Sequence, residues 1–171
     1  KNIDMRTHKG SMPGLKWAFL PKLTRGNTVS ATLTMRFGDL QSTMNQSVNA
    51  DFVSDLLDKG TTTKTRQQIK DQLDSLKARV FFGGGSSSAT VSIETIKENL
   101  PAVMDIVMDM LKNPAFPEKD FEELRQELLS EAEQSHSEPQ ALMTTAMRRH
   151  FNQYEKGDPR YVMTANEEIE A

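Results

Sequence analysis

Hydrophobic and polar residues alternate along two stretches near the start of the chain, which predicts two β-strands. Residues 14–21 carry apolar side chains at every second position after a Pro-Gly turn signal. Residues 27–37 keep the same period over a longer stretch, with Thr, Ser and Arg at most intervening positions. This alternation is typical of strands in an antiparallel sheet that buries one face and leaves the other polar.

From Gln46 onward the apolar residues recur every three or four positions, which is the period of an amphipathic helix. The pattern predicts one helix that ends at Lys59-Gly60 and a second helix after a Thr that can cap it. The later predicted elements are that second helix at 65–77, strands at 79–82 and 88–95, and helices at 99–111, 117–135 and 139–151. Paired strands between groups of helices predict an α+β domain, with helices covering one face of a mainly antiparallel sheet.

These elements fit a single domain, which we place at residues 14–165. Its length is ordinary for one domain, in a chain of 171 residues. Residues 1–13 are polar and are predicted to be a linker, and the acidic residues 166–171 are predicted to begin another. We therefore expect the chain to be a fragment of a longer protein.

Composition excludes several classes of function. Apolar residues make up 36% and charged residues 26%, which is typical of a globular domain. The net charge is −3 and the densest basic run is Arg148-Arg149-His150, so we predict no nucleic-acid binding. The absence of cysteine excludes disulfides, thiolate metal sites and Cys nucleophiles, and it is compatible with either a cytoplasmic or a periplasmic protein. No apolar run approaches the ~18 residues of a membrane span.

Candidate chemistry concentrates in residues 49–61, which read NADFVSDLLDKGT. Asp51 and Asp55 stand one helical turn apart, with Ser54 between them. A zinc-binding helix uses this spacing for its ligands, but the residue types here are wrong for zinc.

Two other features have simple structural interpretations. The chain's histidines are far apart in sequence and lack the spacing of a metal-binding pair: His8, His136 and His150. The GGGSSS stretch at 83–88 has no following Lys and precedes a strand, so we interpret it as a hairpin connection, not a phosphate loop.

The stretch at 49–61 resembles the signature of the insulinase/pitrilysin-type zinc metallopeptidases, the inverzincins, which include the mitochondrial processing peptidases. Their signature is His-x-x-Glu-His on a helix, often within A-H-F-L-E-H-M-L-F-K-G-T. The positions that match are Ala50, Phe52, Leu57, Lys59, Gly60 and Thr61. Asp51 and Asp55 stand where the family has its two His ligands, and Ser54 stands where it has its catalytic Glu. The family's third ligand, a Glu on a later helix, corresponds to Glu131.

Three further stretches resemble the same family, so that the resemblance covers residues 14–165. GLKWAFLPK followed by NTVSATLTMRFGD resembles its opening hairpin. NLPAVMDIVMDMLKNPAFPEKDFEELRQELLSE resembles its two helices after the central strands, and YEKGDPRYV is similar to the segment before its next domain.

The resemblance implies that the chain is the first domain of an inactive, C-terminal half of a zinc-dependent metalloendopeptidase. In the family, two homologous halves close around a peptide substrate, and the zinc-bearing half or subunit would be the partner of this chain. There the two His and a Glu hold the zinc, and the motif Glu accepts a proton from its bound water. Ser54 cannot act as that base at neutral pH, so we expect no catalysis and no zinc in this domain.

Other interpretations remain open. On a helical wheel Asp51, Ser54, Asp55 and Asp58 share one polar stripe, which we interpret as facing solvent or a cavity. Alternatively, Asp51, Asp55 and Glu131 could hold a hard cation such as Ca²⁺ or Mg²⁺, which would make the chain an enzyme in its own right. A third possibility is a structural or assembly module without a peptidase partner.

Overall fold

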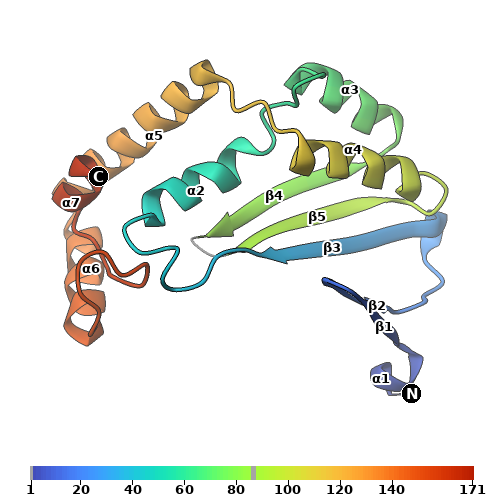
Figure 1. Ribbon diagram of the computed structural model, residues 1–171, viewed down its shortest axis with the longest axis horizontal. Helices are drawn as coiled ribbons and strands as arrows, with labels where there is room; N and C mark the ends of the chain where they lie inside the picture. The colour runs from blue at the N-terminus through green and yellow to red at the C-terminus, as the bar shows by residue number, and fades with distance from the viewer. Residues whose placement is uncertain (1, 86–87) are drawn as a thin grey trace.

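A three-stranded antiparallel sheet with helices on one face forms the centre of the fold (Figure 1). The computed structural model describes residues 2–85 and 88–171, and the side chains of Ser47, Ala50 and Asp51 lie outside that description. The strand order is β3 (Thr28–Arg36), β5 (Ser88–Ile96) and β4 (Arg79–Gly85). The covering helices are α2 (Ser47–Leu56), α3 (Arg66–Ser75) and α4 (Leu100–Lys112). The predicted α+β class is confirmed.

The core lies between the sheet and these helices. Alternate residues of β5 are buried, and Val91 and Ile93 are at most 1% exposed. They pack with Val103 and Val107 of α4, which are also completely buried. The period-two pattern of β3 is confirmed, since its residues alternate between exposed and half-buried. The opposite face of the sheet carries mainly Ser and Thr side chains from β3 and β5.

The amino-terminal hairpin differs from the expected arrangement. The resemblance indicated that residues 14–21 pair with the next strand, but β2 (Leu15–Phe19) instead pairs with β1 (His8–Met12). A Pro13-Gly14 turn joins them, and Gly14 has a φ of +77° that favours glycine. The ring of Trp17 lies directly over Gly10, where any Cβ would collide with it.

The predicted linkers also contain regular structure. Residues 1–13 include β1 and a short helix, α1 (Ile3–Arg6), and α7 (Ala165–Glu170) occupies most of 166–171. The predicted domain boundaries themselves remain predictions.

Beyond α4 the chain leaves the sheet through two long helices. They are α5 (Glu118–Ser137) and α6 (Pro139–Phe151), and α7 returns against α5 (Figure 1). The predicted inward face of α5 is only partly covered, since Ala132 is buried but Leu128 is 36% exposed. In the described part of the chain, no helix is long and apolar enough to cross a membrane.

Candidate functional site

Helix α2, which carries the family-like stretch, lies over strand β4 (Figure 1). Ser54 is only 3% exposed, and its Oγ lies 2.5 Å from the point that a Cβ on Gly84 would occupy. The Ser54 side chain therefore points at the sheet. This corrects the expectation that Ser54 belongs to a polar stripe facing solvent or a cavity, since its hydroxyl faces the strand. The wheel assigns Ser54 to the polar side by residue type, but a small hydroxyl fits closely against a glycine in the strand below.

The acidic residues of α2 and its end have different surroundings. Asp55 is exposed, as predicted. The Asp58 carboxylate forms an ion pair with Lys59, whose Nζ lies 2.8 Å away. It forms a second ion pair, at 3.5 Å, with Arg66 at the start of α3. Such partly exposed pairs typically contribute about 0–1 kcal/mol each. Asp58 therefore helps to join α2 to α3.

The Lys-Gly-Thr end of the stretch has a structural role. Gly60 has a φ of +130°, and a Cβ there would lie 3.1 Å from the carbonyl oxygen of Lys64. The buried Thr61 accepts a hydrogen bond from the Lys64 backbone N–H at 3.1 Å, and Lys64 Nζ reaches Asp109 of α4 at 3.3 Å. A hydrogen bond from Asn113 and this contact with Lys64 lower the pKa of Asp109. The family-like residues Lys59, Gly60 and Thr61 thus belong to a turn that connects the end of α2 with α4.

Glu131, which the family resemblance aligns with the third zinc ligand, is exposed on α5 beside the buried Ala132. Helix α5 contacts α2 through the rings of Phe52 and Phe121, whose centroids are 5.0 Å apart. Among the side chains that the structure describes, no three His, Asp or Glu groups are placed to hold a metal. The Asp51 side chain lies outside that set, so a cation site that includes it remains a prediction.

The residues at the motif positions do not fit zinc. Two carboxylates replace the neutral imidazole nitrogens, and the hydroxyl of Ser54 is enclosed between α2 and β4. A general base must reach the water that it deprotonates, and position 54 is closed to solvent.

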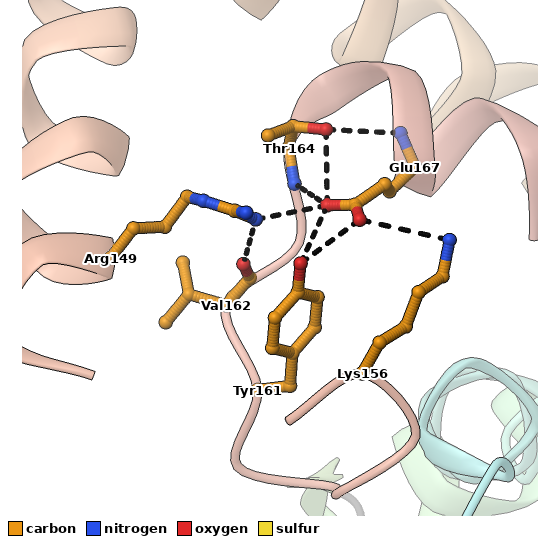
Figure 2. Close-up of polar contacts among 6 residues, drawn as sticks. All are labelled: Arg149, Lys156, Tyr161, Val162, Thr164 and Glu167. Atoms are coloured by element: carbon orange, nitrogen blue, oxygen red, sulfur yellow. Dashed lines mark hydrogen bonds and ion pairs between the residues drawn. The ribbon is translucent and has the colours of Figure 1, made fainter. Parts of the chain in front are cut away.

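A polar cluster that sequence reasoning missed surrounds Glu167 of α7 (Figure 2). Its carboxylate accepts hydrogen bonds at 2.9 Å from Arg149 Nη1, the Tyr161 hydroxyl and the Thr164 backbone N–H. Lys156 Nζ lies 3.7 Å away. The bond from the Thr164 backbone, followed by those from Tyr161, the Thr164 side chain and Arg149, lowers the pKa of Glu167 to about 2.

This cluster stabilises the junction of α6 and α7. Arg149 also donates to the carbonyl of Val162 at 2.7 Å, so it holds the loop between the two helices (Figure 2). The spacing Thr164-x-x-Glu167 is a capping box that could be seen in the sequence. The contributions of Arg149 and Tyr161 depend on tertiary placement, and no local pattern reveals them.

An open groove lies beside β4. A hollow of about 270 Å³ is lined by residues of α3 and of this strand, which include both apolar and charged side chains. The apolar lining includes Ile69, Leu73, Phe82 and Met110. The outer edge of β4 pairs with no strand in the described part of the chain. Backbone groups at such an edge are available to an added strand.

Comparison with known proteins gives a consistent result. The family model of insulinase (peptidase family M16) matches residues 19–161. An uncharacterized zinc protease of Rickettsia bellii is 25% identical over 117 residues, which are 68% of this chain and 28% of the relative. The β subunit of the mitochondrial-processing peptidase of Neurospora crassa is 28% identical over 85 residues, which are 50% of this chain and 18% of the subunit. The chain thus spans less than a third of either relative.

Solved structures share the fold. The crystal structure of a peptidase M16 inactive domain from Pseudomonas fluorescens superposes with a TM-score of 0.74 at 16% identity, covering 93% of this chain and 38% of that one. A protease from Helicobacter pylori gives a TM-score of 0.66 at 14% identity, covering 84% of this chain and 35% of that one.

Proposed function

Because the chain belongs to the insulinase family of peptidases (peptidase family M16), we propose that it is a non-catalytic domain that forms one wall of a peptide-binding chamber. The opposite wall is a homologous half or subunit that binds zinc and cleaves the peptide. One observation carries this proposal: the sequence of α2 keeps family-like residues around the motif but has Asp51, Ser54 and Asp55 at the motif positions, and Ser54 is buried. The parent protein is then a zinc metalloendopeptidase whose catalytic group lies outside this chain.

The groove between α3 and β4 is the surface that best suits a peptide. An extended peptide can add to an open strand edge through backbone hydrogen bonds, while neighbouring pockets receive its side chains. The groove offers such an edge and an apolar hollow of about 270 Å³. Arg66, Lys70 and Arg79 line it together with Asp58 and Asp74, so its margin is slightly cationic. We expect it to favour extended apolar peptides with a carboxylate near the apolar side chain.

Fluorescence anisotropy with a labelled, extended apolar-acidic peptide tests this surface. Lys70→Glu should weaken binding about 2- to 5-fold, as loss or reversal of a partly exposed charge contact does. Lys112→Glu is the matched control, since Lys112 is exposed at the end of α4 and does not line the groove. Equal weakening by both variants would contradict the placement of the peptide. Absence of peptide binding would favour an assembly module without a peptidase partner.

The non-catalytic assignment has its own test. Calorimetric titration with zinc should show no stoichiometric binding, and the chain with zinc added should not cleave peptides. Zinc or magnesium uptake that Asp51→Ala and Glu131→Ala both weaken would instead support a rebuilt carboxylate site and overturn the assignment.

A further inference from the structure

Helix α6 presents an apolar stripe to solvent. Met143, Met147 and Phe151 stand four residues apart and therefore share one face of the helix. They are 64%, 59% and 76% exposed. The opposite side of α6, with Thr145 and Arg149, faces α5 and α7 and is half-buried. The stripe therefore lies on the side of α6 that faces away from α5 and α7.

A hollow extends this stripe. It has a volume of about 390 Å³, and its lining includes Met147, Phe151, Tyr154 and Val162. Arg160 lies at its margin, with its guanidinium carbon 3.8 Å from the centre of the Tyr154 ring. Asp158 accepts hydrogen bonds from Arg160 at 2.7 and 2.9 Å, so this cation is already neutralised within the chain. The hollow therefore combines apolar side chains with the polar side chains of Arg148, Asn152 and Arg160.

We propose that this face of α6 binds a second copy of the same chain, with the two α6 helices packed antiparallel about Met147. The stripe is self-complementary because its three residues are spaced evenly around its centre. In an antiparallel pair, Met143 of each copy lies opposite Phe151 of the other, and the two Met147 side chains meet on the two-fold axis. Methionine sulfur makes favourable contacts with aromatic rings, which suits the Met143–Phe151 pairs.

The flanking charges agree with this orientation. Antiparallel packing sets Arg148 opposite Ala146, and His150 opposite Thr144, of the second copy. Parallel packing would set Arg148 against Arg148 and would bring like charges together. An isologous pair of this kind is the commonest form of oligomer.

The exposed area is sufficient for the core of an interface. Met143, Met147, Phe151 and Tyr154 together expose on the order of 500 Å², if a large side chain is taken as ~200 Å². Patches of this size on soluble proteins often mark interaction sites. A stable interface buries about 800 Å² on each partner, so the stripe and hollow supply most of the requirement. Figure 1 shows α6 at one end of the molecule, clear of the sheet.

Sedimentation equilibrium of the 171-residue chain, from about 1 to about 200 μM, tests the proposal. We expect a reversible dimer that Met147→Lys abolishes and Met147→Leu retains. Met5→Lys is the matched control, because Met5 is 88% exposed on α1. Circular dichroism verifies that each variant is folded. A chain that stays monomeric over the whole range, or a dimer that Met147→Lys leaves intact, would overturn the proposal.

Cysteine cross-linking tests the orientation, since the chain has no cysteine of its own. Met147→Cys should oxidise to a disulfide dimer, whereas Met5→Cys should not. A mixture of the Met143→Cys and Phe151→Cys variants should cross-link faster than either alone. Faster cross-linking of each variant with itself would indicate a parallel pair and contradict the proposed geometry. The peptide groove lies on other elements, so this proposal and the proposed function can fail independently.

Discussion

Gly84 and Ser54 show how closely α2 approaches the sheet. A Cβ on Gly84 would lie 2.5 Å from Ser54 Oγ and 2.5 Å from the carbonyl oxygen of Ser88. A Glu at position 54, as the family motif has, would need several more atoms in a space that already excludes one methyl group. Close packing of α2 on β4 therefore leaves little room for a longer side chain at position 54, so we expect that Ser54→Glu alone does not supply a general base.

Gly84→Ala should lower the free energy of unfolding. The added methyl group must displace backbone atoms of β5, and overpacking of this kind typically costs about 1–3 kcal/mol. Gly83→Ala is the matched control, because a Cβ at Gly83 would meet nothing within 4 Å. Gly83→Ala should leave the free energy of unfolding nearly unchanged or raise it by up to ~1 kcal/mol, because alanine lowers the conformational entropy of the unfolded chain. Urea denaturation measures both, and equal values would show that α2 does not press on Gly84.

At the residue scale, the sequence predicted features that depend on neighbouring residues in the chain. It did not predict features that depend on contacts between distant elements. The Thr65 cap of α3 was predictable, since Thr65 and Gln68 form a capping box. The exposure of Asp55 was predicted correctly. The burial of Ser54 was not, because it depends on a glycine that lies across the packing interface.

At the scale of elements, the spacing of hydrophobic residues predicted the type and position of those helices and strands that bury one face. The predicted helix at 139–151 coincides with α6, and the strand at 27–37 with β3 (Thr28–Arg36). Strand β1 was missed because HKGSM has no buried face and hence no apolar alternation. The pairing expected for β2 from the family resemblance was wrong, because β2 pairs with β1 through the Pro13-Gly14 turn and with Trp17 over Gly10.

The junction of α6 and α7 should weaken in acid. Glu167 has a pKa of about 2 in the folded chain and about 4.5 when unfolded. Because the folded pKa is the lower one, the carboxylate stabilises the fold above pH 4.5, and this stabilisation is lost as the pH falls toward 2. Thermal unfolding of the wild type and of Glu167→Gln should therefore differ most near neutral pH and converge in acid.

Glu170→Gln is the control for this pH series, because Glu170 is exposed in the same helix. It should follow the wild type at every pH. A Glu167→Gln variant that remains equally destabilised at pH 2 would show that the amide disturbs packing, and would separate that effect from the loss of the charge.

At the scale of the whole molecule, the chain exposes far more surface than a compact protein of its mass. Its accessible surface is 12,495 Å², whereas the scaling for compact monomers gives roughly 8,400 Å² at 19.2 kDa. The excess follows from the architecture, in which a small core lies under α4 while the hairpin and α5–α7 extend from it (Figure 1). Such a shape suits a domain that builds a wall with other units, as proposed for this chain.

Stability should accordingly vary along the chain. Amide exchange reports local opening, which ranges from nearly free in exposed segments to the global free energy in the core. We expect β5 and α4 to exchange slowest, and β1, α6 and α7 to exchange much faster. Hydrogen exchange with mass spectrometry at about 1 μM, where α6 pairing would be weak, measures this gradient.

Glu167→Gln should increase exchange in α6 and α7 and leave β5 unchanged, because the carboxylate joins only the carboxyl-terminal elements. Raising the concentration should slow exchange in α6 alone if two copies pair there. A uniform response of all elements would mean that the extended helices and the sheet unfold as one cooperative unit. In that case the protein would be one rigid body despite its large surface, and α6 and α7 would open only when the whole chain unfolds.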